Sequence, residues 1–231
     1  MTEFEWEESG VPARYRGLML DDCPAEAADA VRKFCNGNGT DVLIITGGNG
    51  TAKTSVASAS FTERDMNGLE VGLYLSCKYQ LCPMFRSARL SNFDMSEYTL
   101  YKKYYEAPYL VIDEYGKGDD GRLEKAVVRN VISARYDMGL LTMLVTNHTM
   151  KEITGDSEVG LGADITSRFR ETATVLVMDG MDWRASNRGM PHVNPGQKSK
   201  GKIRCIICGG EMTDAGTCSN PKCAAYCGDV R

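Results

Sequence analysis

A lysine and a threonine, Lys53 and Thr54, follow a glycine-containing turn whose composition suits the binding of a polyphosphate. The apolar residues 42–45 before the turn indicate a buried strand, and the residues from Lys53 onward indicate a helix. In such a strand–turn–helix, backbone N–H groups face the phosphates, the lysine reaches the outer phosphates and the threonine hydroxyl can hold Mg²⁺. The candidate ligands of a nucleotide such as ATP are therefore Gly48, Asn49, Gly50, Thr51, Ala52, Lys53, Thr54 and Ser55.

One position departs from the pattern G-x-x-x-x-G-K-[ST] of a phosphate-binding P-loop, because Ala52 stands where the second glycine is expected. We expect residue 52 to have nearly helical backbone geometry already, so that its methyl group is tolerated. Alanine also has the highest intrinsic helix propensity. The alternative is a glycine-rich turn that arises by chance, since short motifs produce false matches.

Two adjacent carboxylates, Asp113 and Glu114, end a second apolar run at residues 109–112. Such a run suits a parallel strand whose carboxyl end faces a ligand crevice. Asp113 is then placed to hold Mg²⁺, directly or through water, and Glu114 to polarise the attacking water in phosphoryl transfer. A third strand, residues 140–146, ends at Asn147, which could orient the same water; a strand-terminating asparagine is the alternative.

In several separate segments the chain resembles AAA+ ATPases of the DnaC helicase-loader and IstB transposition-ATPase type. The matching segments, in chain order, are residues 10–16, the P-loop, and residues 110–114, 124–125, 135–136, 145–147 and 161–169. The resemblance runs from about residue 10 to about residue 185. It implies a P-loop AAA+ three-layer α/β fold with a central parallel sheet, and it is less specific for one function within that class.

The resemblance also implies roles for residues outside these two motifs. Arg14 and Tyr15 would lie near the adenine, and Arg184 would be a sensor arginine near the phosphates. Arg168 would be an arginine finger that completes the site of a neighbouring subunit, with Arg170 as the competing candidate. A finger supplied in trans requires a ring or helical homo-oligomer. Each arginine taken alone also fits a solvated or ion-paired surface residue.

As a whole, the resemblance implies a DNA-replication accessory ATPase that binds ATP·Mg²⁺ and single-stranded DNA and acts on a replicative helicase. Candidate DNA contacts in the mixed region 78–105 are Arg86, Arg89, Lys102 and Lys103, since cations follow a nucleic-acid backbone and nearby tyrosines can stack on bases. An amphipathic helix with solvated charges is the equal alternative. Two other functions stay open: an IstB-like transposition helper that remodels duplex DNA, and a nucleotide-gated scaffold that recruits partners.

The chain divides into four parts. Residues 1–9 are a short acidic leader for which we expect no regular structure, although its aromatic residues also permit a docking peptide. Residues 10–185 form the ATPase domain, with further helices expected at 24–35 and 122–138 and further strands at 72–76 and 174–178. Residues 186–203 form a basic linker that contains proline and glycine, and residues 204–231 form a cysteine-rich module.

Cysteines in the last segment have the spacing C-x2-C-x9-C-x4-C, which is typical of a zinc ribbon. The expected Zn²⁺ ligands are Cys205, Cys208, Cys218 and Cys223, with Cys227 as an alternative fourth ligand. A closed four-thiolate site is structural, and metal binding would supply the folding energy that so small a module cannot obtain from a core. Whether the ribbon contacts DNA or protein stays open.

Composition leads us to expect a soluble, cytoplasmic protein that does not enter a membrane. The 231 residues suffice for one α/β domain and a small appendage, and 25% charged and 42% hydrophobic residues are ordinary for a globular chain. No apolar run is long enough to span a bilayer, and the N-terminus lacks a basic region followed by an apolar one. A net charge of -4 argues against a uniformly basic surface but permits a local basic patch.

Overall fold

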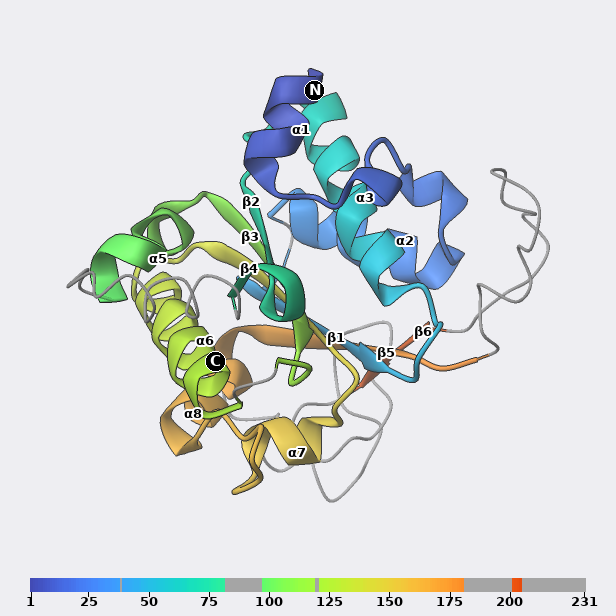
Figure 1. The fold of residues 1–231 in the computed structure, drawn as a ribbon. Helices are drawn as coiled ribbons and strands as arrows, with labels where there is room; N and C mark the ends of the chain where they lie inside the picture. The colour runs from blue at the N-terminus through green and yellow to red at the C-terminus, as the bar shows by residue number, and fades with distance from the viewer. Residues whose placement is uncertain (38, 82–96, 119–120, 181–200, 205–231) are drawn as a thin grey trace.

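A central parallel sheet organises the computed structural model, which describes residues 1–37, 39–81, 97–118, 121–180 and 201–204 (Figure 1). Five parallel strands lie in the order β2-β3-β4-β1-β5, and β6 pairs with β5 in the antiparallel direction. The strands are β1 (Val42–Gly47), β2 (Leu73–Ser76), β3 (Tyr109–Tyr115), β4 (Leu141–Thr146), β5 (Ala173–Met178) and β6 (Gly201–Arg204). This sheet confirms the predicted α/β fold.

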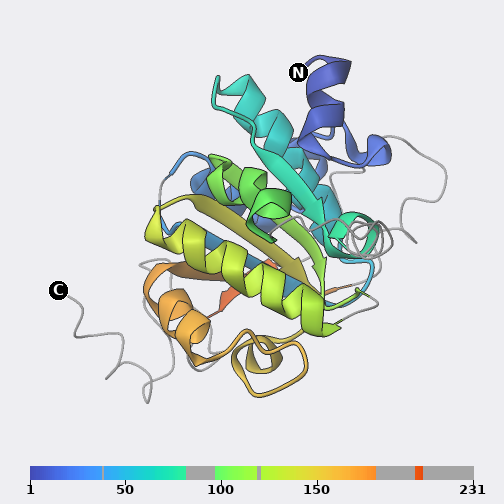
Figure 2. The same cartoon turned by 60° about the vertical axis from the view of Figure 1, so that its left-hand side comes forward.

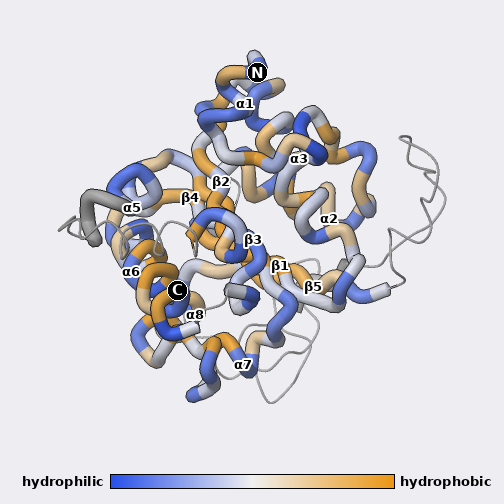
Figure 3. The backbone as a smooth tube through the Cα atoms, in the orientation of Figure 1, coloured by the Kyte–Doolittle hydropathy of each residue, from blue (hydrophilic) through white to orange (hydrophobic). Residues whose placement is uncertain are grey.

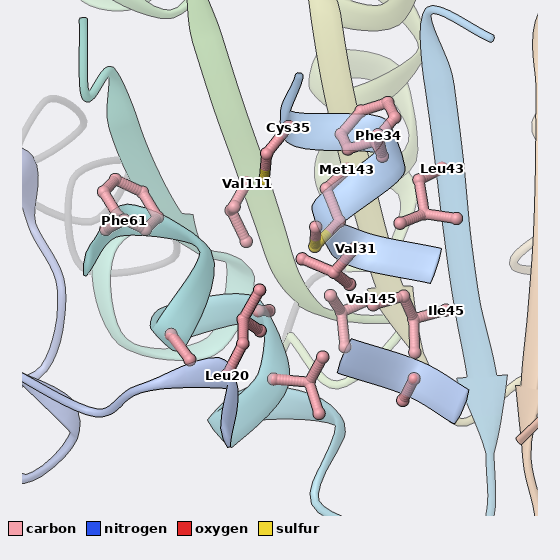
Figure 4. Close-up of a cluster of buried hydrophobic side chains, with 14 of the residues drawn as sticks. Leu20, Val31, Phe34, Cys35, Leu43, Ile45, Phe61, Val111, Met143 and Val145 are labelled. Carbon is pink, nitrogen blue, oxygen red and sulfur yellow. The ribbon is translucent and has the colours of Figure 1, made fainter. Parts of the chain in front are cut away.

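The strands are short apolar runs because helices cover both faces of the sheet. Alternate strand residues enter two separate cores, since successive side chains point to opposite faces. The first core contains Leu43, Ile45, Val111, Met143 and Val145, together with Val31 and Phe34 from one helix and Phe61 from another (Figure 4). The second core contains Ile44, Leu110, Ile112 and Leu144, together with Val128, Val131 and Phe169 from the opposite helices.

The helices form the two outer layers. Helices α2 (Ala25–Cys35) and α3 (Lys53–Met66) pack together on one face, while α5 (Glu97–Glu106), α6 (Gly121–Asp137) and α8 (Ala163–Thr172) cover the other (Figure 2). The short helix α7 (Met150–Thr154) follows β4 and packs against α8. Apolar residues follow the strands and the inner faces of the helices (Figure 3). Within the described segments, no helix has both the length and the apolar character needed to cross a membrane.

A buried guanidinium, that of Arg135 near the end of α6, joins α6 to α5 and β4. The residue is 0% exposed. It donates to the hydroxyl of Thr142 at 2.8 Å and to the carbonyls of Tyr104 at 2.9 Å and Ala107 at 2.6 Å. Two of these acceptors lie at the C-terminus of α5, where the helix dipole favours a cation. Burial lowers the pKa of Arg135 to about 9. Because its hydrogen bonds reach α5 and β4, the buried cation serves the packing of these elements.

Residues 3–9 form a helix, α1 (Glu3–Ser9), so the expectation of an unstructured leader is wrong. Thr2 and Glu5 form a capping box at its start, and Trp6 is buried in the first core. The helix ends at Gly10, whose φ is +79° and where a Cβ would lie 2.7 Å from the carbonyl oxygen of Tyr74. Only glycine fits this approach to β2, and the leader is therefore part of the folded domain.

Candidate nucleotide-binding site

A cleft opens at the carboxyl ends of β1, β3 and β4, beside the N-terminus of α3, and contains about 490 Å³ of space that is continuous with solvent. Parallel α/β sheets bind ligands at this edge. The residues that line the cleft are Tyr15, Asn49, Gly50, Thr51, Ala52, Lys53, Thr54, Ser55, Asp113, Glu114, Lys117, Val145, Thr146 and Asn147. The structure therefore brings the P-loop, the two carboxylates and the asparagine together, whereas Gly48 and Arg14 do not line the cleft.

The turn between β1 and α3 curls around the amine of Lys53. That amine donates to the carbonyl oxygens of Gly47 at 2.8 Å and Gly48 at 2.5 Å and to the hydroxyl of Thr51 at 3.3 Å. Lys53 is only 7% exposed. At Gly47 the φ is +141°, and a Cβ would lie 2.1 Å from the carbonyl oxygen of Met178. The Lys53 amine is thus held at the centre of the loop, and the backbone at Gly47, where the loop begins, leaves no room for a side chain.

Ala52 adopts a left-handed backbone, with φ 66° and ψ 15°. The prediction that residue 52 has nearly helical geometry is therefore wrong. An L-residue in this region costs about 1–2 kcal/mol relative to a right-handed one. The position needs the conformation that glycine provides, and its methyl group is accommodated because it packs against the first core. Strain of this kind is concentrated at functional sites.

Asp113 at the end of β3 is only 2% exposed, and its hydrogen bonds fix its orientation. The Tyr74 hydroxyl donates to Oδ2, and the backbone N–H of Glu114 donates to Oδ1 at 2.7 Å. Burial raises the pKa of Asp113, while hydrogen bonds from Tyr74, Glu114 and the Thr54 hydroxyl oppose that rise. The carboxylate is thus held beside Thr54 at the start of α3.

The Thr54 hydroxyl and the Asp113 carboxylate fit a Mg²⁺ site. Both are hard oxygen donors, and a hydrogen bond already joins them. Mg²⁺ usually takes one or two protein ligands and completes its octahedron with water and substrate phosphates. The described part of the chain contains no group of three or more His, Cys, Asp or Glu residues that could hold a metal ion. Thr54 and Asp113 fit a site in which water and phosphate oxygens supply the remaining ligands.

Glu114 also has a left-handed backbone, with φ 60°. Its half-buried side chain lines the cleft. The Ser76 hydroxyl, at the end of β2, donates to Glu114 Oε2 at 3.2 Å, and the Lys117 amine lies 4.0 Å from Oε1. The strained turn therefore presents one carboxylate to the cleft between a hydroxyl donor and a cation.

Asn147, which follows β4, donates from Nδ2 to Oδ1 of Asn49 in the P-loop at 2.6 Å. The contact spans the cleft from the loop after β4 to the loop after β1. The two asparagines place amide groups at the mouth of the cleft, where they could contact a terminal phosphate or a water molecule.

The two residues predicted to lie near adenine occupy different positions. Tyr15, in the short 3-10 turn Ala13–Tyr15, lines the cleft. Arg14 is exposed and stacks on the Tyr15 ring, with its guanidinium carbon 4.4 Å from the ring centroid. Arg14 thus reaches the site through Tyr15.

Arg168 on α8 lies outside its own cleft. Its guanidinium donates to the carbonyl oxygen of Ser133 at 3.0 Å, lies 3.6 Å from the carboxylate of Asp137 and stacks on the ring of Tyr136. Arg170 is exposed. The candidate finger is therefore a pre-ordered side chain on the outer helical layer.

Other predicted site residues are exposed or lie outside the described residues. Lys102 and Lys103 are exposed on α5, where Lys102 lies 3.8 Å from Glu106. Those that lie outside the described residues are Arg86, Arg89, Arg184, Cys205, Cys208, Cys218, Cys223 and Cys227.

Five residues at or beside the cleft were not predicted as site residues: Lys117, Val145 and Thr146 line it, and Tyr74 and Ser76 donate to Asp113 and Glu114. Ser76 carried a readable signal, because a polar residue that ends a parallel strand faces the same edge as Asp113 and Asn147. Tyr74 resembles any apolar strand residue until its hydroxyl is seen to meet Asp113. Lys117 lies in the turn after β3, and the hydrophobic periodicity of a sequence does not predict the course of a turn.

No protein-family model matches the chain, and no curated protein matches it. Solved structures do resemble it. The DnaC helicase loader superposes with a TM-score of 0.57 at 23% identity, over 72% of this chain and 99% of that one. DnaI superposes with a TM-score of 0.57 at 18% identity, over 72% of this chain and 93% of that one.

The replication initiator DnaA, in a structure with AMPPCP and single-stranded DNA, gives a TM-score of 0.53 at 15% identity, over 73% of this chain and 50% of that one. At such identities the likeness shows the fold alone. The chain therefore shares the α/β fold of these solved structures.

Proposed function

We propose that the protein is an AAA+ ATPase that binds ATP·Mg²⁺ and hydrolyses it. One observation carries this proposal: the Lys53 amine, the Thr54–Asp113 pair, Glu114 and Asn147 line one cleft, although three separate segments supply them. Phosphoryl transfer needs positioned charges more than covalent chemistry. Cation, hydroxyl, paired carboxylates and amide are the groups that this reaction uses.

Each residue then has one task. Lys53 exchanges its bonds to the loop carbonyls for phosphate oxygens, and Thr54 and Asp113 hold Mg²⁺. When bound, Mg²⁺ would neutralise phosphate charge. Glu114 accepts a hydrogen bond from the attacking water and takes its proton, and Asn147 orients that water from the opposite side.

We propose further that Arg168 acts in trans, in a ring or helical homo-oligomer. The support is its position, since the guanidinium lies on the outer helical layer and does not line its own cleft. Arginine fingers contribute large rate increases by stabilising transition-state charge. Arg168→Ala should then lower turnover while leaving nucleotide binding to the subunit's own cleft unchanged.

The macromolecules on which the ATPase acts are proposed from its likeness to DnaC, DnaI and DnaA. The solved DnaA contains single-stranded DNA, and the solved DnaC is a helicase loader. We propose that this ATPase serves DNA replication, binds single-stranded DNA in its ATP state and acts on a replicative helicase. The four tail cysteines, Cys205, Cys208, Cys218 and Cys223, are proposed to hold a structural Zn²⁺, which a zinc-to-protein ratio near unity would support.

Matched single-stranded and duplex DNA test this proposal. The zinc-replete protein is titrated onto each DNA with ATP, with ADP and without nucleotide, and Lys53→Ala is the control that cannot use ATP. We expect ATP-dependent binding that prefers the single strand and is absent in the variant. Preference for duplex DNA would favour a transposition helper, and ATP binding without any DNA binding or turnover would favour a nucleotide-gated scaffold.

A further inference from the structure

A buried carboxylate, that of Glu124 in the first part of α6, holds the turn that follows Glu114. Glu124 is 2% exposed. Its Oε1 accepts the backbone N–H of Gly116 at 2.6 Å, and its Oε2 accepts the backbone N–H of Gly118 at 2.9 Å. Both oxygens are thus engaged by the chain immediately after the candidate base. A buried carboxylate is stable only with such partners.

The turn that Glu124 holds has an unusual backbone. Glu114 has φ 60° and Gly116 has φ 83°. At Gly116 a Cβ would lie 2.3 Å from Nε2 of His148, so the backbone passes directly under that ring. Before Glu114, the Asp113 carboxylate accepts the Glu114 N–H at 2.7 Å. Carboxylates therefore fix the strained turn on both sides of Glu114.

The surroundings of Glu124 connect three loops of the site. The thiol of Cys77, next to Ser76 after β2, donates a hydrogen bond to it. The turn after β3 contributes the two N–H donors, and the His148 ring, next to Asn147 after β4, lies close enough to interact with its charge. The segments after β2, β3 and β4 thus all meet this carboxylate, and two of them carry the candidate catalytic residues Glu114 and Asn147. Glu124 itself does not line the cleft.

We propose that Glu124 is a positioning residue for the hydrolytic step, which holds the Glu114 turn in its left-handed conformation without touching the nucleotide. The proposal rests on the proposed ATPase function. Losing one of its two bonds should let the turn relax toward right-handed geometry and move the Glu114 carboxylate away from the water. A misplacement of about 1 Å lowers a catalysed rate by about 10²-fold. Nucleotide binding depends on the P-loop and should stay unchanged.

Glu124→Gln is the direct test. Glutamine keeps the size and one acceptor oxygen, but its amide nitrogen would face an N–H donor, so one bond is lost. Glu158→Gln, at an exposed site, makes the same charge change and serves as the matched control. We expect kcat to fall about 10–100-fold in Glu124→Gln, with the Kd for a fluorescent ATP analogue within about twofold of wild type, and the control to behave as wild type.

Amide hydrogen exchange supplies a readout that does not depend on turnover. The amides of Gly116 and Gly118 should be protected in the wild type and exchange faster in Glu124→Gln, while the amides of β1 stay unchanged. Unprotected amides in the wild type would overturn the proposal even if the variant does not fold. Wild-type kcat in the variant, or equal losses of kcat and nucleotide affinity, would also overturn it. Absence of turnover in the wild type would instead refute the ATPase function.

Discussion

Replacing Ala52 by glycine tests the left-handed P-loop most simply, because the variant is expected to lose little or no stability. The left-handed backbone costs alanine about 1–2 kcal/mol, which glycine would relieve. Against this, glycine loses about 0.5–1 kcal/mol more backbone entropy on folding, and the half-buried methyl group contributes about 0.4 kcal/mol of burial. These figures place the free energy of unfolding of Ala52→Gly between about 0.4 kcal/mol below and about 1.1 kcal/mol above that of the wild type.

Two further variants serve as references for the change in the free energy of unfolding. Ala126→Gly, at an exposed position inside α6, should cost about 1 kcal/mol, as glycine does in any helix interior. Gly47→Ala combines a φ of +141° with a Cβ placed 2.1 Å from the Met178 carbonyl oxygen, and it should cost most. Urea denaturation of the nucleotide-free variants measures all three. If Ala52→Gly were destabilised as much as Ala126→Gly, residue 52 would not be left-handed in solution.

Three further predictions follow from buried polar groups. Tyr74→Phe removes the hydroxyl that donates to Asp113. The free energy of unfolding, measured by urea denaturation, should fall by about 1.5–3 kcal/mol, and the Mg²⁺ concentration needed for half-maximal turnover should rise. An unchanged Mg²⁺ requirement would contradict the role of this hydroxyl in holding Asp113. Arg135→Met leaves several buried acceptors unpaired and should cost about 3–5 kcal/mol; a loss below about 1 kcal/mol would contradict the joining role of this cation. Burial raises the pKa of Glu124, so the folded state holds that proton more tightly than the unfolded chain and loses stability as pH rises from the ordinary glutamate pKa through the raised pKa of the folded state. Glu124→Gln should remove part of that loss relative to wild type, and parallel pH profiles of the two proteins would show that the group does not titrate as described.

The sheet was predictable because its strands are buried on both faces. Residues 42–45 and 109–112 are continuous apolar runs, and the second run ends at Asp113, which lines the cleft. The rule that parallel strands present their carboxyl ends at one edge then brings Lys53, Asp113 and Asn147 together. Motif spacing therefore predicted the cleft, and the structure places these residues in it.

Other features depended on contacts that no local pattern shows. The left-handed backbone of Ala52 is imposed by the closure of the loop around the Lys53 amine, not by the helix propensity of alanine. The capping box of Thr2 and Glu5 was readable in the sequence, yet α1 is held by burial of Trp6 against the domain, which is a tertiary effect. Residues 124–125 belong to a segment that resembles the helicase-loader family, but the sequence does not show the bonds of Glu124, because its two backbone partners come from another turn.

Equilibrium ATP·Mg²⁺ binding and steady-state hydrolysis, measured side by side for the wild type, Lys53→Ala and Glu114→Gln, test the central claim most directly. The account predicts that Lys53→Ala loses nucleotide binding. It predicts that Glu114→Gln binds ATP like the wild type and loses turnover by about 10²–10⁴-fold, the usual contribution of a general base. Wild-type binding by Lys53→Ala, or wild-type hydrolysis by Glu114→Gln, would contradict it.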